Sequence, residues 1–187
     1  AYKFFGPHVG LLWGRQEHME SLTPYKLRVT TDDLPGRWMT GTQNHEGIAG
    51  TLAAINYLAG LAEAPSRQAG LDAAFDAITE HENTLATHTL RRLREIDGLQ
   101  IFGITDETRL DRRVPTFTFR PPACPPREMA RRLGKAGIFT WHGNYYALPL
   151  TEALGIEPEG AVRAGFLHYN TLEEADRLVN ALRKICT

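Results

Sequence analysis

One lysine near the start of the chain stands in a setting that could give its amine a chemical role. Lys3 is followed by two aromatic residues, a Gly-Pro turn and an apolar run that ends at Gly14. An amine among apolar and aromatic neighbours loses part of its hydration, which lowers its pKa and makes it a better nucleophile. The alternative is a solvated lysine at a strand edge, and the residue types alone favour it. The apolar run itself predicts a buried strand over residues 9–13.

An arginine inside a strand-like segment is the second candidate. Arg163 lies among small and apolar residues in the alternating segment 161–169. A guanidinium in such surroundings needs an anionic partner. That partner is either a carboxylate of the protein or the carboxylate of a bound molecule, which arginine matches with two parallel hydrogen bonds. The residues alone leave both possibilities open.

Two loops offer further polar groups. Gly41 and Thr42 come shortly before a predicted helix, whose N-terminus can bind an anion, although Thr42 or Asn44 could also simply cap that helix. His142, Tyr145 and Tyr146 surround a glycine directly after a predicted strand. Such a loop is typical of a pocket edge, but its tyrosines could equally pack on their own domain.

The elements that must position these groups alternate between helices and strands. Helical spacing of apolar residues and a capping box at Thr171 and Glu174 mark the helices, and runs of β-branched and aromatic residues mark the strands. The sequence therefore predicts an α/β fold. The predicted helices cover residues 48–61, 67–97, 126–134 and 172–185, and the predicted strands cover 99–103, 114–119, 138–141 and 161–169, with a polar, turn-rich segment at 15–37.

Composition excludes several classes of protein. The 187 residues carry a net charge of -1, which leaves no basic footprint for nucleic acid or an anionic membrane. No apolar run has the length of a membrane span, and we expect no signal peptide. Cys124 and Cys186 do not make a disulfide framework, and the histidines do not predict a metal site. We expect a soluble, cytoplasmic protein with no nucleic-acid partner and no membrane partner.

Taken in order, these motifs resemble those of the class V aminotransferase family, the fold-type I PLP enzymes that include cysteine desulfurases. Residues 2–10, Tyr-Lys-Phe-Phe-Gly-Pro-His-Val-Gly, resemble the segment around the PLP-binding lysine, which implies a catalytic and cofactor-binding role for Lys3. Gly41-Thr42 resembles a dipeptide that reaches the PLP phosphate of the partner subunit, which implies a homodimer with shared active sites. The segment Arg-Ala-Gly-x-x-x-Tyr-Asn-Thr-x-Glu-Glu resembles a signature whose arginine, here Arg163, holds the substrate α-carboxylate.

Residues 143–150 resemble the Gly-x-x-Cys-Ala-x-Pro-Leu loop of cysteine desulfurases, with Tyr146 in place of the cysteine that accepts sulfur. A phenol cannot become a persulfide, so the chain resembles a desulfurase-like branch that lacks this step. The resemblance implies a small amino-acid substrate, for which His142, Tyr145 and Tyr146 are candidate contacts. Elimination of a C–S or C–Se bond, transamination and epimerisation stay open.

The resemblance also implies that the chain is a C-terminal portion, because the cofactor lysine of this family lies well into the sequence. Residues 1–80 would be the end of the large PLP-binding domain, and residues 81–187 the small C-terminal α/β domain, with the boundary inside the long helix. The alternative is a non-catalytic fragment or interaction subunit that keeps the fold without PLP.

Overall fold

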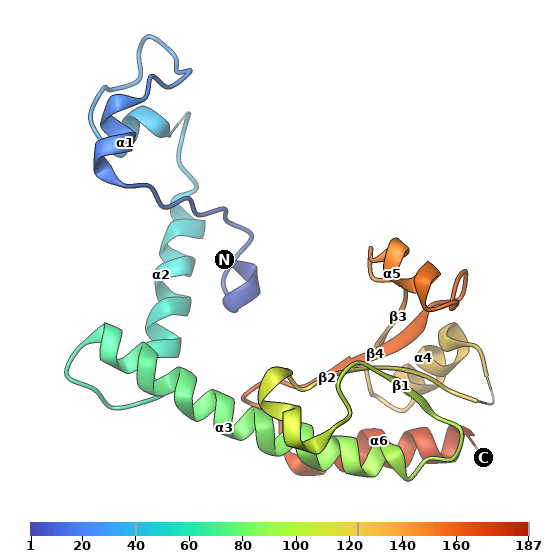
Figure 1. Cartoon of the computed structure of the whole chain (residues 1–187). Coiled ribbons are helices and arrows are strands. Elements are labelled where there is room, and N and C mark those ends of the chain that lie inside the picture. Colours follow the sequence, from blue (N-terminus) through green and yellow to red (C-terminus); the bar gives the residue numbers. More distant parts are fainter. Residues whose placement is uncertain (40, 123, 187) are drawn as a thin grey trace. The chain divides into compact units, whose positions relative to one another are not determined.

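The computed structural model describes residues 1–39, 41–122 and 124–186 (Figure 1). The chain forms two compact units, an N-terminal unit (Ala1–Phe75) and a C-terminal unit (Asp76–Thr187), and each is described by itself. The predicted long helix is present as α3 (Arg67–Arg94), and the division between the units falls within it.

The C-terminal unit is built on a four-stranded antiparallel sheet with the order β1-β2-β4-β3. All four strands predicted for this unit form, although the third starts later than the sequence pattern suggests. The mixed helices and strands confirm the predicted α/β class. The strands are β1 (Gln100–Phe102), β2 (Thr116–Arg120), β3 (Trp141–Gly143) and β4 (Ala161–Gly165).

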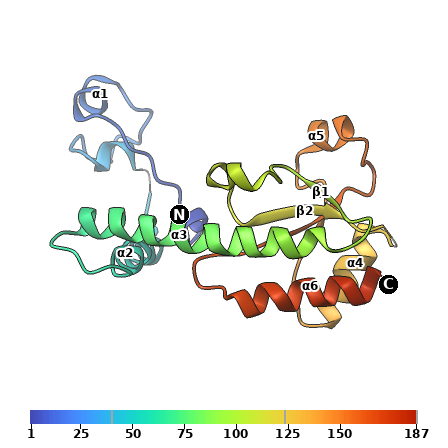
Figure 2. The same ribbon diagram turned by 60° about the horizontal axis from the view of Figure 1, so that its bottom comes forward.

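Helices cover one face of this sheet. Helix α3 and helix α6 (Leu172–Cys186) run side by side beneath it, and α4 (Pro126–Lys135) packs on the same side (Figures 1 and 2). Burying each large apolar side chain between these layers stabilises the unit by about 1.5–3 kcal/mol. The fully buried large side chains of this core include Leu85, Leu90, Leu93, Phe117, Phe119, Met129, Leu133, Val162, Val179 and Leu182.

The other face of the sheet, here called the open face, carries the residues that alternate with this core. Phe117 and Phe119 point to the helices, so Thr116 and Thr118 point the other way, as the alternation in the sequence predicts. Directly paired residues of antiparallel strands share a face. The open face therefore includes Thr116 and Thr118 from β2, Phe102 from β1, Trp141 from β3, and Arg163 and Gly165 from β4.

Local sequence signals set where helices α6 and α4 begin. Glu174 N–H donates to Thr171 Oγ1 at 3.3 Å, and the Glu174 carboxylate accepts from the backbone N–H of Thr171 at 3.0 Å. This reciprocal pair is the predicted capping box, which satisfies two backbone donors that the first helical turn leaves without partners. Elsewhere, Pro126 occupies the first turn of α4, where its missing N–H costs nothing.

The N-terminal unit contains only helices and turns within the residues described. They are η1 (Tyr2–Phe4), α1 (Gln16–Ser21), η2 (Gly36–Trp38) and α2 (His45–Ala59).

The strand predicted over residues 9–13 is wrong for this structure. Leu12 and Trp13 are 88% and 81% exposed, and no strand is assigned there. A strand forms only beside a neighbour that pairs with its N–H and C=O groups. The described part of the N-terminal unit offers no such neighbour.

Helix α2 buries several small residues and Leu58, while other large apolar residues stay exposed. Ile48 and Leu52 are exposed, whereas Gly47, Thr51, Ala54 and Leu58 are buried. The reason is close approach of the preceding segment, because a Cβ placed at Gly47 or Gly50 would press on Val9 or Pro7 respectively. Two glycines one turn apart thus let the segment after Lys3 lie directly on the helix.

Candidate active site

Lys3 sits in a short helical turn at the start of the N-terminal unit. Its side chain is exposed, and its Nζ lies 5.0 Å from the centroid of the Tyr2 ring. That ring in turn stacks on His8 with a centroid separation of 4.8 Å. Phe5 ends the turn in the left-handed conformation, at φ 69°. Within the described ranges no acidic side chain lies within ion-pair distance of Lys3, so its amine is accessible to a carbonyl reagent.

The backbone before α2 supplies a second polar group in the same unit. Asn44 is the N-cap, since its Oδ1 accepts from the Gly47 N–H at 2.9 Å. One of the two predicted caps is thereby identified, and Thr42 is left exposed and free of the capping role. Gly41 has φ 68°, a conformation that favours glycine. A hydroxyl and backbone N–H groups at a helix start suit a phosphate.

Arg163 lies at the centre of the open face of the C-terminal sheet. Its strand, β4, is paired on both sides, with Thr118 of β2 on one side and Trp141 of β3 on the other. The guanidinium carbon stands 4.6 Å from the centroid of the Tyr145 ring. Across the residues described, no carboxylate pairs with it, so the structural ion pair that the sequence left open is not formed.

Trp141 and Thr118 are neighbours of Arg163 that sequence reasoning did not single out. Both come from strands far away in the sequence, and only the non-sequential strand order places them beside β4. The alternation within each strand is visible in the sequence. The pairing between strands has no local signal, so these flanking residues could not have been found.

Tyr145 and Tyr146 follow β3 in consecutive left-handed conformations, with φ of 56° and 62°. Such conformations are unfavourable for residues other than glycine and persist only when surrounding contacts hold them. Asn144 provides one contact, because its Oδ1 accepts from the Tyr146 N–H at 3.2 Å. The turn separates the two phenols. Tyr145 is half-buried against β4, whereas Tyr146 is fully exposed.

Helix α5 (Leu148–Ala153), where only a loop was expected, begins immediately after this turn.

Two glycines hold this turn against β4. Gly143 at the end of β3 has φ 113° and Gly160 before β4 has φ 68°. A Cβ placed at Gly160 would overlap the backbone carbonyl group of Gly143. The two backbones therefore touch at this point, and the start of the tyrosine turn is fixed relative to β4.

His142 does not join Arg163 on the open face. It pairs with Val162, whose side chain is buried on the helix side, whereas Trp141 pairs with Arg163. The structure thus brings together Arg163 and Tyr145 among the predicted substrate contacts. It leaves Tyr146 at the tip of the turn and His142 on the other face of β3.

The cysteines show no sign of activation. Cys124 and Cys186 are free, half-buried and packed against the helix-side core. Burial raises the pKa of both thiols, which lowers the thiolate fraction that a nucleophile needs.

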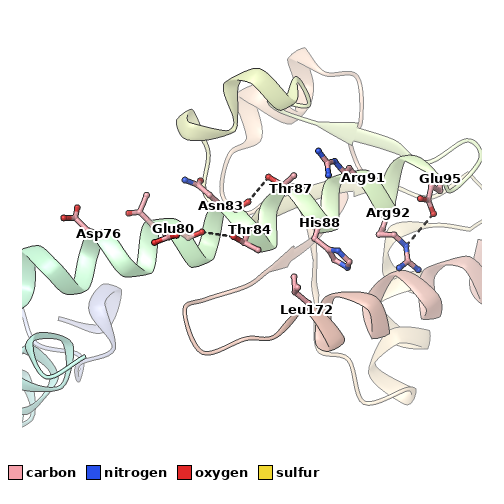
Figure 3. Close-up of a pocket in the computed structure, with 11 residues that line it drawn as sticks. Asp76, Glu80, Asn83, Thr84, Thr87, His88, Arg91, Arg92, Glu95 and Leu172 are labelled. Carbon is pink, nitrogen blue, oxygen red and sulfur yellow. Dashed lines mark hydrogen bonds and ion pairs between the residues drawn. The ribbon is translucent and has the colours of Figure 1, made fainter. Parts of the chain in front are cut away.

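A groove of about 890 Å³ runs along α3 next to the start of α6 (Figure 3), and the basic side chains in its lining are held by carboxylates. Arg92 donates to Asp176 at 2.7 Å, and His88 Nε2 lies 2.8 Å from the same carboxylate. Arg91 forms an ion pair with Glu107 at 2.8 Å. These contacts join α3 to its neighbours and occupy the basic side chains of the groove, so we assign this groove a structural role.

Neither a metal cluster nor a membrane-crossing helix is present in the described ranges. No three His, Cys, Asp or Glu side chains there are grouped closely enough to hold a metal ion. No helix there combines the length and apolar character that a membrane crossing needs.

Known proteins with similar sequences include probable cysteine desulfurases. One from Staphylococcus epidermidis is 30% identical over 98% of this chain, and one from Staphylococcus aureus is 28% identical over the same share. The chain spans 43% of the length of each of these relatives.

Solved structures with similar folds carry the same description. The cysteine desulfurase CsdA from Escherichia coli, in its S-sulfonic acid form, matches 97% of this chain and 43% of its own chain, with 27% identity and a TM-score of 0.75. The apo cysteine desulfurase from Thermococcus onnurineus matches 91% of this chain and 41% of its own, with 25% identity and a TM-score of 0.72. The fold is that of the C-terminal part of these enzymes.

The profile of the family described as "Aminotransferase class-V" matches residues 1–178, nearly the whole chain. This match, with the relatives and the shared fold, agrees with the motif order around Lys3, Gly41-Thr42 and Arg163. The chain belongs to the class V aminotransferase family.

Proposed function

We propose that this chain is the C-terminal portion of a PLP-dependent, cysteine desulfurase-like enzyme that acts at the α and β carbons of a small amino acid. The observation that carries the proposal is Arg163, an arginine on the open face of the sheet with an aromatic ring beneath it and no carboxylate partner among the described residues. An unpaired guanidinium with a fixed backbone is suited to a substrate carboxylate.

The groups present fit PLP, the cofactor that members of this family use. Lys3 offers an exposed primary amine for a covalent bond to the cofactor aldehyde. Gly41 and Thr42 offer a backbone N–H and a hydroxyl at the start of a helix, which suit the phosphate. By family resemblance they would serve the phosphate of a partner subunit, and we therefore propose a homodimer.

Each residue of this chain then has a defined task. Arg163 binds the α-carboxylate of the substrate and orients its α-carbon. When bound, PLP supplies an electron sink that stabilises negative charge at that carbon. The amine of Lys3 takes or returns the proton there. Tyr146, which is fully exposed, is the proposed group for substrate-side contacts, since the strand register places His142 on the face of β3 away from Arg163.

Tyr146 also bears on the class of reaction. A phenol cannot hold sulfur as a persulfide, and burial raises the pKa of the Cys124 thiol. We therefore propose cleavage of a C–S or C–Se bond with direct release of the product, rather than transfer of sulfur to the protein. The two free cysteines are consistent with a reducing, cytoplasmic setting.

Borohydride reduction tests the cofactor assignment. The purified protein is incubated with PLP, reduced, and mapped by peptide mass spectrometry. We expect a phosphopyridoxyl group on Lys3. Lys26 is the internal control, since its Nζ donates to the Thr30 carbonyl at 2.8 Å and pairs with Asp32 at 3.0 Å. Equal labelling of Lys3 and Lys26, or no labelling, would contradict the proposal.

A product assay tests the reaction class. L-Cysteine and L-selenocysteine are supplied to the PLP-loaded protein, with Lys3→Arg as the control. Sulfide or selenide released together with pyruvate and ammonia would support elimination with direct release of the product. A keto acid that retains the sulfur or selenium, formed together with the aminated cofactor, would show transamination instead.

A further inference from the structure

Tyr145 makes a set of contacts that its fully exposed neighbour Tyr146 does not share. Its hydroxyl donates to the backbone carbonyl of Ala161 on β4 and lies 3.4 Å from the carbonyl of Trp141 on β3. The phenol thus joins two neighbouring strands at the point where the turn leaves the sheet. The ring is held at both its ends, by the backbone of the turn and by these carbonyls.

The hydroxyl is a permanent donor at these positions. Burial raises the pKa of Tyr145 to about 12, and the positive charge of Arg163 opposes this only in part. A phenol with such a pKa stays protonated throughout the range in which enzymes work, so it keeps donating to the carbonyls. It is therefore not a general base, and its ring keeps a neutral face toward the guanidinium.

The guanidinium of Arg163 rests on this fixed ring. The distance of 4.6 Å from its carbon to the ring centroid is within the range of a cation–π contact. An exposed arginine otherwise samples many rotamers, and binding a ligand must then restrict them. A ring contact restricts the arginine side chain and leaves its N–H donors available. A carboxylate partner would restrict the side chain too, but it would occupy those donors.

We propose that Tyr145 is a positioning residue that pre-organises Arg163 for a carboxylate ligand. The proposal rests on the proposed function for the identity of that ligand, an amino-acid substrate. It assigns Tyr145 a role through Arg163 rather than through direct contact with the substrate. The two adjacent tyrosines would therefore differ in task, with Tyr145 holding the arginine and Tyr146 facing the solvent.

The test is NMR spectroscopy of arginine side chains in the complete chain without PLP. Arg163→Lys identifies the Nε–Hε signal of Arg163 by its disappearance. In the parent protein we expect this signal to be displaced by the ring current of Tyr145. Tyr145→Asn removes the ring and suits the left-handed backbone. We expect it to return the signal to the position of a freely mobile arginine, while Tyr145→Phe keeps most of the displacement.

Titration with sodium acetate, against sodium chloride at equal ionic strength, measures carboxylate binding through the same signal. Losing the ring contact and the restricted rotamer should weaken acetate binding by about three- to tenfold in Tyr145→Asn. Tyr25→Phe is the control, since Tyr25 is fully exposed, and it should change nothing. If Tyr145→Asn does not fold, as judged by circular dichroism, Tyr145→Leu replaces it.

An Arg163 signal that is unchanged in the ringless variant, or acetate binding unchanged within twofold, would overturn the positioning role. So would an Arg163 signal that does not respond to acetate in the parent protein. None of these results depends on PLP or turnover. Failure of this inference is therefore distinguishable from failure of the proposed function, which is decided by labelling of Lys3.

Discussion

The two faces of the C-terminal sheet use the same strands for different purposes. On the helix side, β2 and β4 contribute Phe117, Phe119 and Val162, all fully buried in the core. On the open face the same two strands present Thr118 and Arg163 beside Trp141. The period-2 geometry of a strand allows one short segment to supply both a core and a binding surface.

The two faces also differ in the partners of their charged side chains. Along the helix side, Arg92 and His88 share the carboxylate of Asp176, and their side chains are about 70% buried. On the open face Arg163 rests on an aromatic ring instead. An arginine that ties elements together has its anion within the protein. We infer that an arginine that binds a ligand is held by a contact that leaves its donors available.

The largest effect on stability is expected from the core. Phe117→Ala should lower the free energy of unfolding by about 3–5 kcal/mol, because it leaves a cavity where the ring packs edge-on to Phe166 at a centroid distance of 6.5 Å. It also removes the ring that lies 4.4 Å from the Arg113 guanidinium. Urea denaturation measures the change. Thr118→Val, one residue along on the open face, should change the free energy of unfolding by less than about 1 kcal/mol. Similar losses for both variants would show that the two faces do not differ in their contribution to stability.

A smaller effect is expected where α3 meets α6. Asp176→Asn keeps the size of the side chain and removes the charge that Arg92 and His88 share, so we expect a loss of about 1–2 kcal/mol, reduced by partial exposure to solvent. Thermal unfolding at neutral pH measures it. A loss larger than that of Phe117→Ala would show that ion pairs rather than packing hold this layer together.

The carboxylate of Asp176 should also make the free energy of unfolding depend on pH. The hydrogen bond from His88, followed by the charges of His88 and Arg92, holds the pKa of Asp176 below its ordinary value. Its contribution to stability is therefore fully present above the unfolded pKa of about 3.9 and is lost as the pH falls through the lower folded value. Below pH 4 the free energy of unfolding should fall more steeply in the parent protein than in Asp176→Asn. Parallel curves would contradict this account.

The smallest effect on stability is expected for Arg163. Arg163→Gln should cost less than about 1 kcal/mol, since it removes one exposed cation–π contact and breaks no ion pair among the described residues. The same variant should raise the KM for an amino-acid substrate while leaving Lys3 open to labelling by PLP. A large loss of stability would contradict the distinction between the two faces, because Arg163 would then be a structural residue like Arg92.

Features of the fold with a local cause could be predicted from the sequence. β-branched and aromatic residues identified the strand that holds Phe117 and Phe119, and Thr171 and Glu174 identified the start of the last helix. Helix α3 was equally evident from its spacing. The α/β class follows from these elements. The roles of Lys3, Gly41, Thr42 and the loop residues stay predictions that rest on family resemblance.

Features that depend on distant partners could not be predicted. The strand order decides that Trp141 and Thr118 flank Arg163, and no local pattern encodes it. The expected strand near Leu12 failed for the same reason, because pairing needs a neighbour. Helix α2 buries Gly47 rather than Ile48, since close approach of a backbone segment there outweighs the burial of a larger side chain.

The contact between Gly143 and Gly160 can also be viewed through the genetic code. Every missense change of one nucleotide in a glycine codon introduces a residue with a Cβ atom. At position 160 that atom would meet a neighbouring backbone, which cannot swing away as a side chain can, and the φ of 68° adds strain for any L-residue. A single-nucleotide missense change at position 160 should therefore displace the backbone at Gly143, from which the tyrosine turn begins.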